Sequence, residues 1–187
     1  MTVDARSIPL LARVFYFLRH GETESNRRLL IAGSLDVELT DTGREQARAA
    51  ADRVKSLGIT AIYSSGLRRT RDTAQAIADA LGLPVTPIAA LNERNWGDLE
   101  GKPRAARVRG LTPAGAETPQ QYMERTAAGL AGIPAAGVPL VVAHSGTYRV
   151  LCRLLDHAHG TEPITNCHPV RFTPPDGGAG KWRVEML

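Results

Sequence analysis

Two short runs of consecutive apolar residues constrain the fold more than any other feature of this sequence. Residues 13–19 contain Val-Phe-Tyr-Phe-Leu without interruption, and residues 138–143 are Val-Pro-Leu-Val-Val-Ala. Strands that helices cover on both faces of a parallel sheet have this composition, because neither face meets water. The runs end at His20 and His144. We therefore expect an α/β protein in which two buried strands each present a histidine at the carboxyl edge of the sheet.

Helices and further strands alternate between and after these runs. Thr42 and Glu45 have the spacing of a capping box, and apolar residues then recur at helical spacing until Gly58. The pattern also predicts strands at 59–63 and 85–88, helices between Gly66 and Gly82, at 118–133 and at 145–156, and a hairpin of residues 167–173 and 182–186. The sequence therefore predicts a three-layer α/β/α fold with a mostly parallel central sheet, helices on both faces and an antiparallel edge near the C-terminus.

Length and composition fit one domain. The chain has 187 residues, 43% of them hydrophobic, which is enough for one compact core. We interpret 1–187 as a single domain, with a flexible lead-in at 1–13 and an active-site loop or lid at 91–117. No stretch approaches the roughly eighteen apolar residues of a membrane span, and the N-terminus does not read as a secretory signal. Cys152 and Cys167 have no paired spacing, so we expect reduced thiols in a cytoplasmic protein.

The charge balance favours an anionic ligand. The formal net charge is +4, and arginine far outnumbers lysine. The planar guanidinium group suits phosphate oxygens, so a phosphate ligand fits this composition, and so does nucleic acid. Aromatic residues that could stack on bases make up only 5% of the chain. A basic nucleic-acid-binding module is therefore a remote alternative, and we expect neither nucleic acid nor a membrane among the partners.

Three predicted strand ends carry reactive or cationic side chains. They are Arg19 with His20, the Arg68-Arg69 segment, and His144. Ligands of open α/β sheets bind at the carboxyl ends of the strands. One histidine in such a place is commonly a structural residue, but two histidines accompanied by arginines are difficult to explain by packing. We therefore expect this edge of the sheet to hold the functional site.

At this edge the sequence resembles a known family. Leu18-Arg19-His20-Gly21-Glu22-Thr23, followed by Asn26, resembles the signature of the histidine phosphatase superfamily, which includes the cofactor-dependent phosphoglycerate mutases. Four further blocks follow in family order: Leu39-Thr40-Asp41-Thr42-Gly43, Ser64-Ser65-Gly66-Leu67-Arg68-Arg69, Leu91-Asn92-Glu93-Arg94, and Val142-Ala143-His144-Ser145-Gly146. The resemblance covers residues 14–149, and five ordered blocks are more specific than one short motif.

The resemblance implies a covalent mechanism. His20 would attack phosphorus and become phosphohistidine, which divides one difficult displacement into two easier steps. Arg19, Arg69 and His144 would surround the phosphoryl oxygens and stabilise the charge that develops there. Cationic neighbours would also lower the pKa of His20, which must be neutral to attack.

The resemblance also assigns a proton-transfer group and further phosphate contacts. Glu93 would protonate the leaving alkoxide and later deprotonate water, which requires a raised pKa, and burial near Trp96 would favour this. An ion pair of Glu93 with Arg94 or another arginine is the alternative, purely structural interpretation. The further phosphate contacts are Gly21, Asn26, Gly33 and Ser145, where Gly21 would allow a close approach of the backbone to phosphate.

Departures from the family pattern bear on the reaction. Thr70 stands where the family commonly has a small apolar residue, and residues 114–118 are a weakened form of a family block. The segment between Gly101 and Glu117 is shorter than the arginine-rich insertion of the mutases, which holds a phosphorylated acid over the site. A shorter cover admits water. We therefore expect hydrolysis of a small phosphorylated metabolite, with cofactor-dependent phosphoglycerate mutase activity as the alternative.

Other candidate sites are weaker. The Asp-His-Ala-His motif at 156–159 lacks companion carboxylates for a metal, and Cys167 with His168 falls in the predicted edge hairpin, where we expect no function. We therefore assign neither a metal nor a cofactor. The expected protein is a metal-independent, acid-type phosphatase whose partner is a small-molecule phosphate ester.

Overall fold

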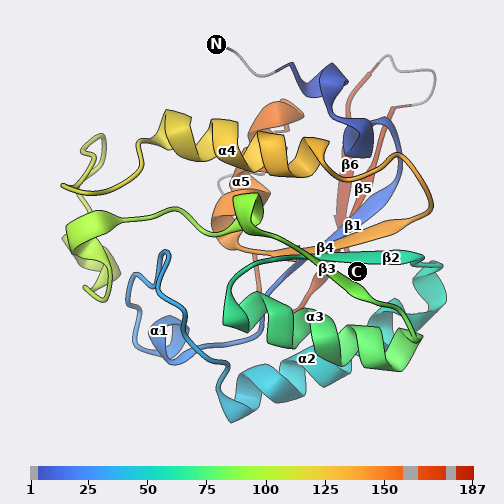
Figure 1. Ribbon diagram of the computed structural model, residues 1–187, viewed down its shortest axis with the longest axis horizontal. Helices are drawn as coiled ribbons and strands as arrows, with labels where there is room; N and C mark the ends of the chain where they lie inside the picture. The colour runs from blue at the N-terminus through green and yellow to red at the C-terminus, as the bar shows by residue number, and fades with distance from the viewer. Residues whose placement is uncertain (1–3, 158–163, 176–179) are drawn as a thin grey trace.

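The centre of the fold is a mixed six-stranded sheet. The computed structural model describes residues 4–157, 164–175 and 180–187, and in this part the strand order is β3-β2-β4-β1-β5-β6 (Figure 1). The strands are β1 (Phe15–Arg19), β2 (Ala61–Ser65), β3 (Val85–Ile88), β4 (Pro139–Ala143), β5 (Pro169–Thr173) and β6 (Arg183–Met186). Strands β3, β2, β4 and β1 are parallel neighbours, whereas β5 and β6 continue the sheet in antiparallel orientation. The predicted mostly parallel sheet with an antiparallel C-terminal edge is confirmed.

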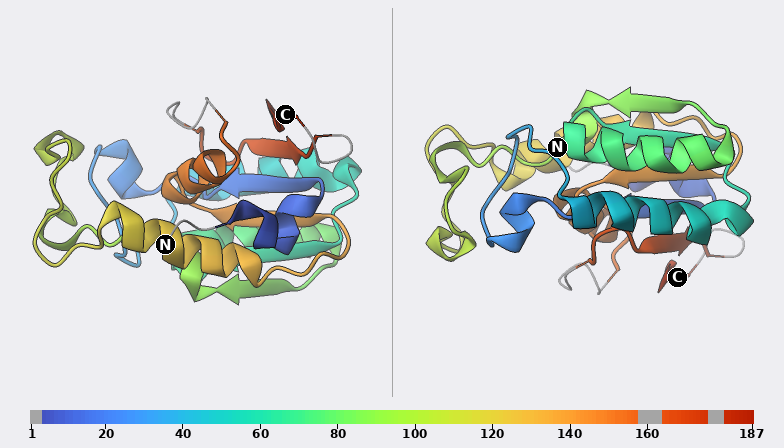
Figure 2. Two further views of the ribbon diagram at one scale, coloured as in Figure 1. Left: turned by 90° about the horizontal axis from the view of Figure 1, so that it is seen from above. Right: turned by 90° about the horizontal axis from the view of Figure 1, so that it is seen from below.

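Helices cover both faces of this sheet. They are α1 (Glu24–Arg27), α2 (Asp41–Val54), α3 (Arg68–Leu81), α4 (Pro119–Ala131) and α5 (Ser145–Leu154). Figure 2 shows α2 and α3 on one face, with α4 and the N-terminal segment on the other. Leu18 and Val142 belong to the hydrophobic cluster on the α2–α3 side, and Phe17 and Val141 belong to the cluster beneath α4 and α5. Side chains of neighbouring residues in a strand thus pack on opposite faces of the sheet, because they alternate along a strand.

The described part of the N-terminal segment, residues 4–13, packs into the core, whereas the sequence pattern predicted a flexible lead-in over 1–13. Two short 3-10 helices, Ala5–Ser7 and Pro9–Ala12, carry the chain across the face that α4 covers. Leu10 and Leu11 are buried in the cluster beneath α4 and α5. Full burial of a leucine stabilises a fold by about 2 kcal/mol, so two such residues can order a short segment that lacks regular structure.

Helix α2 begins earlier than the sequence pattern indicates. The hydroxyl of Thr40, not that of Thr42, caps the helix and accepts a hydrogen bond from the N–H of Gly43 at 3.0 Å, so the predicted capping box is wrong. Thr40 also donates through its N–H to the carbonyl oxygen of Glu22 at 2.9 Å. This long-range contact with the segment after His20 fixes the helix start, which local spacing alone does not show.

Two long segments lie together beyond the carboxyl ends of the parallel strands. Residues 22–40, which contain α1, and residues 92–118 form the left side of the molecule in Figure 1. The N–H of Ile31 donates to the carbonyl oxygen of Lys102 at 2.9 Å, and the N–H of Gly101 donates to that of Ile31 at 2.7 Å. The two segments therefore form connected walls above the strand ends that carry the predicted site.

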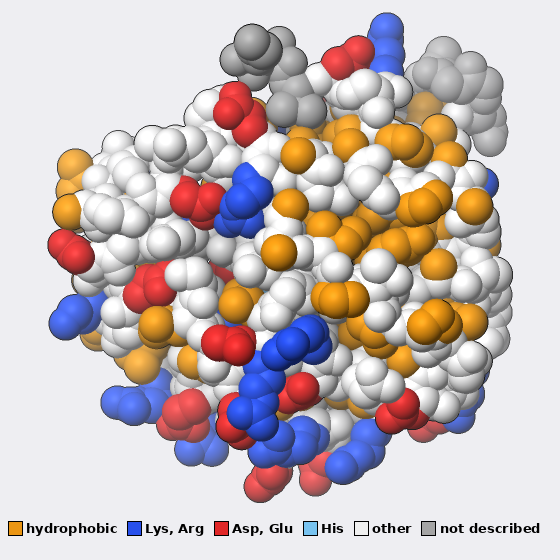
Figure 3. Space-filling view, viewed as in Figure 1, with side chains coloured by type: hydrophobic (Ala, Val, Ile, Leu, Met, Phe, Trp, Pro, Cys, Tyr) orange, Lys and Arg blue, Asp and Glu red, His pale blue; other side chains and the backbone are white. Residues whose placement is uncertain are grey.

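The surface has no single sign of charge on the face shown in Figure 3. Basic and acidic side chains intermix along its lower edge, where α2 and α3 lie, and apolar side chains gather over its centre and upper right. Within the described ranges, none of the helices is long and apolar enough to cross a membrane. His159 of the 156–159 motif lies outside the described residues.

Candidate active site

His20 follows β1 directly and is held in one orientation. Its side chain is 5% exposed, and its backbone N–H donates to the carbonyl oxygen of Ala143 on β4 at 3.1 Å. Nδ1 lies 2.7 Å from the carbonyl oxygen of Gly21, which can only accept, so Nδ1 carries the proton and Nε2 keeps a free lone pair. Burial, and then the charges of Arg69 and Arg19, hold the pKa of His20 well below its usual value. The ring is therefore neutral and presents a nucleophilic nitrogen.

Two guanidinium groups accompany His20, that of the buried Arg69 and that of the half-buried Arg19. Arg69 is 1% exposed and donates to the carbonyl oxygens of Leu35 at 2.7 Å and Gly33 at 2.8 Å. Arg19 donates to the carbonyl oxygen of Ile164 at 2.9 Å. The Nε atoms of both arginines are buried without a hydrogen-bond partner among the described residues. Burial, with neighbouring arginines, lowers the pKa of Arg19 to about 10, so both groups remain cationic at neutral pH.

His144 completes the group at the end of β4. It is fully buried, and its ring meets that of His20 edge to face with 5.4 Å between centroids. Nε2 lies 2.8 Å from the hydroxyl of Ser65, whereas Nδ1 has no partner in the described part of the chain. Burial, and then the charges of Arg69 and Arg19, lower its pKa well below the usual value. We call Arg19, His20, Arg69 and His144 the strand-end cluster.

Sheet register brings the strand-end cluster together. Arg19 pairs with Ala143 across the parallel β1–β4 ladder, so the residues that follow, His20 and His144, leave the sheet side by side. Strand β2 is the other neighbour of β4, and α3 starts three residues after β2 ends, which places Arg69 in its first turn. The cluster therefore follows from three adjacent parallel strands, as the sequence analysis expected of this sheet edge.

Glu93 approaches the strand-end cluster from the segment 92–118, which we call the Glu93 loop. Its carboxylate accepts a hydrogen bond from the N–H of Gly146, in the first turn of α5, at 3.1 Å and one from the N–H of Arg94 at 2.9 Å. Burial raises the pKa of Tyr122, and the adjacent Glu93 carboxylate adds to this, so the phenol stays neutral and can hydrogen-bond to Glu93. The guanidinium of Arg94 donates instead to the carbonyl oxygen of Glu117, at 2.9 and 2.6 Å, and does not use the Glu93 carboxylate as its hydrogen-bond acceptor.

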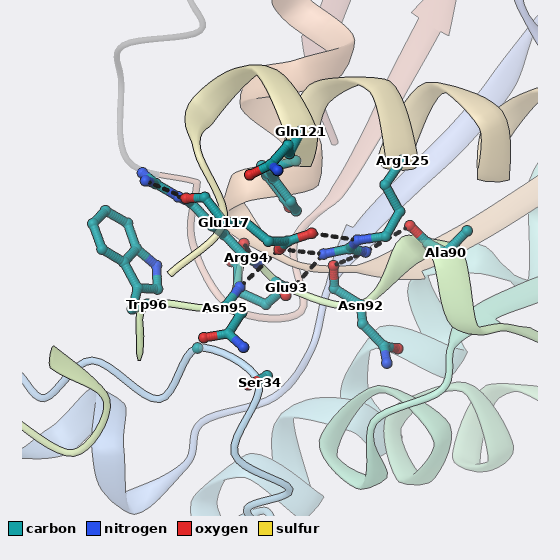
Figure 4. A network of polar contacts seen from close by, with 12 residues as sticks. Ser34, Ala90, Asn92, Glu93, Arg94, Asn95, Trp96, Glu117, Gln121 and Arg125 are labelled. Carbon is teal, nitrogen blue, oxygen red and sulfur yellow. Dashed lines mark hydrogen bonds and ion pairs between the residues drawn. The ribbon is translucent and has the colours of Figure 1, made fainter. Parts of the chain in front are cut away.

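An ion pair behind Glu93 holds the loop against α4 (Figure 4). Arg125 donates to both carboxylate oxygens of Glu117 at 2.7 Å, and it also donates to the carbonyl oxygens of Ala90 and Asn92 at 2.9 and 3.0 Å. Burial alone would raise the pKa of Glu117, but hydrogen bonds from Arg125 and the N–H of Asn95 lower it overall. Sequence reasoning missed this function of Glu117, because only the position of the 114–118 block within the resembled family distinguishes it.

Three of the remaining predicted phosphate contacts lie at one cavity. Asn26, Gly33 and Ser145 line a cavity of about 300 Å³ together with His20 and Glu93. Gly33 has a φ of +53°, and its carbonyl oxygen accepts from Arg69, so its conformation positions the cluster.

Gly21 is needed for packing in this structure, and the approach of its backbone to phosphate stays a prediction. A β-carbon at Gly21 would clash with the carbonyl oxygen of Gly43 in α2. The N–H of Gly21 donates to the hydroxyl of Thr73 on α3 at 3.0 Å. The turn after β1 therefore needs glycine to lie close to α2.

The segment before the C-terminal hairpin also reaches the site. The side-chain amide of Asn166 donates to the carbonyl oxygen of His20 at 2.6 Å and lies 3.4 Å from Oδ1 of Asn26. Ile164 supplies the carbonyl oxygen that Arg19 contacts. The sequence alone does not predict that either residue reaches the site. Asn166 contributes a side-chain amide and Ile164 a backbone carbonyl, and the β1–β5 pairing places both.

Positive charge continues from the strand-end cluster to the cavity mouth. Arginines of the Glu93 loop and of α5 line the same cavity, namely Arg94, Arg104, Arg107, Arg149 and Arg153. The pKa of Arg107 is lowered by burial and then by the charges of Arg149, Arg94 and Arg104. Such an excess of cations around a neutral histidine suits an anionic ligand.

A neutral histidine at a strand end, beside two largely enclosed guanidinium groups in an α/β fold, suits phosphoryl chemistry. Residues 15–186 match the family model of the histidine phosphatase superfamily (branch 1). The chain therefore belongs to the histidine phosphatase superfamily, and the resemblance found in the sequence is confirmed.

Similar proteins include both mutase-named and phosphatase-named members. A probable phosphoglycerate mutase GpmB of Yersinia enterocolitica is 42% identical over 114 residues, which are 61% of this chain and 51% of that protein. The chain thus spans about half the length of the curated relatives it matches.

Two solved structures are similar over nearly their whole length. A mycobacterial glucosyl-3-phosphoglycerate phosphatase has a TM-score of 0.75 at 27% identity. The match covers 94% of this chain and 98% of the phosphatase chain. The structure described as mycobacterial hydrolase 1 has a TM-score of 0.77 at 28% identity. This match covers 92% of this chain and 96% of the hydrolase chain.

Proposed function

We propose that the protein is a phosphomonoester hydrolase that acts on a small phosphorylated metabolite through a phosphohistidine intermediate. The observation that carries this proposal is the state of His20. Its Nδ1–H donates to the carbonyl oxygen of Gly21, its Nε2 keeps its lone pair, and the Nε atoms of Arg19 and Arg69 have no hydrogen-bond partner among the described residues. A dianionic phosphoryl group would supply the acceptors that these buried donors lack.

In the proposed first step, Nε2 of His20 attacks phosphorus while the ester P–O bond breaks. The electron pair of that bond goes to the leaving oxygen, and Glu93 in its acid form donates a proton to it. Arg19, Arg69 and His144 stabilise the phosphoryl oxygens during transfer. In the second step Glu93 takes a proton from water, and the water oxygen attacks phosphorus. The P–N bond breaks, its electron pair returns to Nε2 of His20, and phosphate is released. The chain's own cations supply the charge stabilisation, so we propose that no metal is required.

The cavity mouth bears on the substrate. Arg104, Arg107 and Arg149 lie beyond the strand-end cluster and line the same cavity. A phosphate ester that carries a second acidic group would find a counter-charge there. This is the observation that supports the alternative, a cofactor-dependent phosphoglycerate mutase, together with the name of the Yersinia relative. The phosphatase is favoured because the named mycobacterial phosphatase is similar over 98% of its length, against 51% for that relative.

The test is release of phosphate from p-nitrophenyl phosphate. The wild type should turn it over in the presence of EDTA, and His20→Ala should abolish turnover. Unchanged turnover in His20→Ala would contradict the proposal. Incubation with 3-phosphoglycerate and 2,3-bisphosphoglycerate separates the two activities, because a mutase forms the 2-isomer faster than it releases phosphate.

A further inference from the structure

Hydroxyl groups extend from His144 into the first turn of α3. The Oγ of Ser65 lies 2.8 Å from Nε2 of His144, and the Oγ1 of Thr70 lies 2.6 Å from the Oγ of Ser65. The Oγ1 of Thr70 also lies 2.6 Å from the carbonyl oxygen of Leu67. All four residues are buried. Each hydrogen bond in this row of side chains needs one hydrogen. The position of every hydroxyl and imidazole proton can therefore be assigned by counting donors.

The count has one consistent solution. A carbonyl oxygen can only accept, so the hydroxyl hydrogen of Thr70 is directed to Leu67. The Oγ1 of Thr70 then accepts the hydroxyl hydrogen of Ser65, and the Oγ of Ser65 accepts from His144. The hydroxyl of Thr70 also lies 3.2 Å from the carbonyl oxygen of Ser65, which likewise can only accept, so both carbonyl contacts give the same direction. The reverse direction would place two acceptors 2.6 Å apart without a hydrogen between them.

Nε2 of His144 therefore carries the proton, and Nδ1 is the only atom through which the ring can reach a phosphoryl oxygen. In the neutral ring Nδ1 has a bare lone pair, and its contact with an oxygen of a phosphate dianion would be repulsive. We propose that Ser65 and Thr70 fix this tautomer, so that the occupied site holds one additional proton between Nδ1 of His144 and a phosphoryl oxygen. The inference rests on the proposed function, in which His144 contacts the phosphoryl group.

The surroundings of His144 are consistent with proton uptake on binding. The charged and titratable groups that face it are Arg69 from α3, Arg19 and His20 from the end of β1, and Arg125 from α4. Glu93 reaches Gly146, two residues further along α5. Burial and the cations hold the pKa of His144 low, so the ring of the free enzyme is neutral. The proton therefore enters with the ligand, either as the P–OH of a phosphate monoanion or on the imidazole beside a dianion. Both forms have the same composition, and Ser65 and Thr70 are positioning residues in either case.

Calorimetry measures this proton directly. Inorganic phosphate is titrated into the enzyme at a pH where free phosphate is the dianion, in two buffers of different ionisation enthalpy. The wild type should take up about one proton per phosphate bound, and its phosphate affinity should fall about tenfold per pH unit in this range. In Thr70→Val the hydroxyl hydrogen of Ser65 loses its acceptor and can turn to Nε2, which allows the Nδ1–H tautomer. Uptake should then fall below about half a proton.

Thr70→Ser is the matched control, because it keeps the hydroxyl and should keep the wild-type uptake. Ser65→Ala removes the acceptor of Nε2–H by a second route and should also reduce uptake, which keeps the test decisive if Thr70→Val does not fold.

A wild type that hydrolyses p-nitrophenyl phosphate but binds phosphate without proton uptake would overturn this inference and leave the proposed function intact. Equal uptake in the wild type, Thr70→Val and Ser65→Ala would overturn the assignment to Ser65 and Thr70. A wild type that releases no phosphate from any ester would overturn the proposed function itself.

Discussion

The strand-end cluster and the Glu93 loop face one cavity, but different interactions hold them. His20 and His144 are positioned by the register of β1 and β4, so any sequence that forms these two strands brings them together. Glu93 stands on a segment without long helices or strands, and the Glu117–Arg125 ion pair and single backbone contacts hold it in place. The cluster should therefore tolerate changes elsewhere in the fold, whereas the loop should depend on individual side chains.

Substitution of Arg69 should have the largest effect on activity. Arg69 belongs to the strand-end cluster and also holds the segment 22–40 through Gly33 and Leu35. Arg69→Lys would lose the two-pronged contact with Gly33 and Leu35 and the unpartnered Nε. We expect kcat/KM on p-nitrophenyl phosphate to fall by about 10²–10³-fold, the range for loss of one preorganised donor. Arg68→Lys is the control, since Arg68 is half-exposed and pairs with Asp72 and Glu38 at the surface. A loss of less than about tenfold in Arg69→Lys would contradict this account.

Acid should destabilise the cluster through its two histidines. Their pKa values lie well below the usual value in the folded chain, because burial and the arginines disfavour the charged rings. The unfolded chain therefore binds more protons below about pH 6.5, and the stability of the neutral rings, fully present above that pH, is lost as the pH falls. The loss is about 1.4 kcal/mol per pH unit for each histidine.

Urea unfolding between about pH 7.5 and pH 5 measures this slope. His144→Asn should make the dependence of the unfolding free energy on pH shallower. Trp182→Leu, which removes no titratable group, should leave the slope unchanged. Parallel slopes for wild type and His144→Asn would show that the cluster does not carry the acid sensitivity.

A substitution of Glu117 tests whether its ion pair with Arg125 holds the Glu93 loop in place. Glu117→Gln would remove one charge of the ion pair with Arg125 and release the segment that presents Glu93. A misplaced Glu93 matters most when the leaving group needs a proton, so kcat on an alkyl phosphate should fall about tenfold while p-nitrophenyl phosphate is nearly unaffected. Glu124→Gln, on the exposed side of α4, is the control. Equal losses on both substrates would mean that Glu117 supports more than the proton donor.

The same contrast explains how much of the molecule the sequence could predict. Apolar runs and strand ends predicted the sheet and the convergence of His20, Arg69 and His144, because strand periodicity is a local property and the carboxyl ends of parallel strands meet at one edge of the sheet. The burial of Leu10 and Leu11, the helix start at Thr40 and the contribution of Asn166 depend on partners far along the chain. No local pattern encodes such contacts. Glu93 was found only through the family resemblance, and nothing in the spacing showed that Glu117 holds its loop.

Trp96 should give the smallest effect, confined to the loop. Its ring lies 4.2 Å from the guanidinium carbon of Arg94 and 4.1 Å from that of Arg107. Each exposed cation–π contact contributes about 0.5–1 kcal/mol, so Trp96→Leu should lower the unfolding free energy by at most about 2 kcal/mol. Arg107 lines the cavity mouth, and its release should raise KM by about two- to fivefold, while kcat stays unchanged because the strand-end cluster is untouched.

The second tryptophan of the chain supplies the matched control for that change. Trp182 packs edge to face on Phe15 at the antiparallel side of the sheet, with ring centroids 6.0 Å apart. Trp182→Leu should lower the unfolding free energy without changing KM, since it removes apolar contact far from the loop arginines. If both variants shift KM equally, the effect of Trp96 comes from lost stability and not from the arginines it holds, and the loop then depends less on single side chains than its contacts indicate.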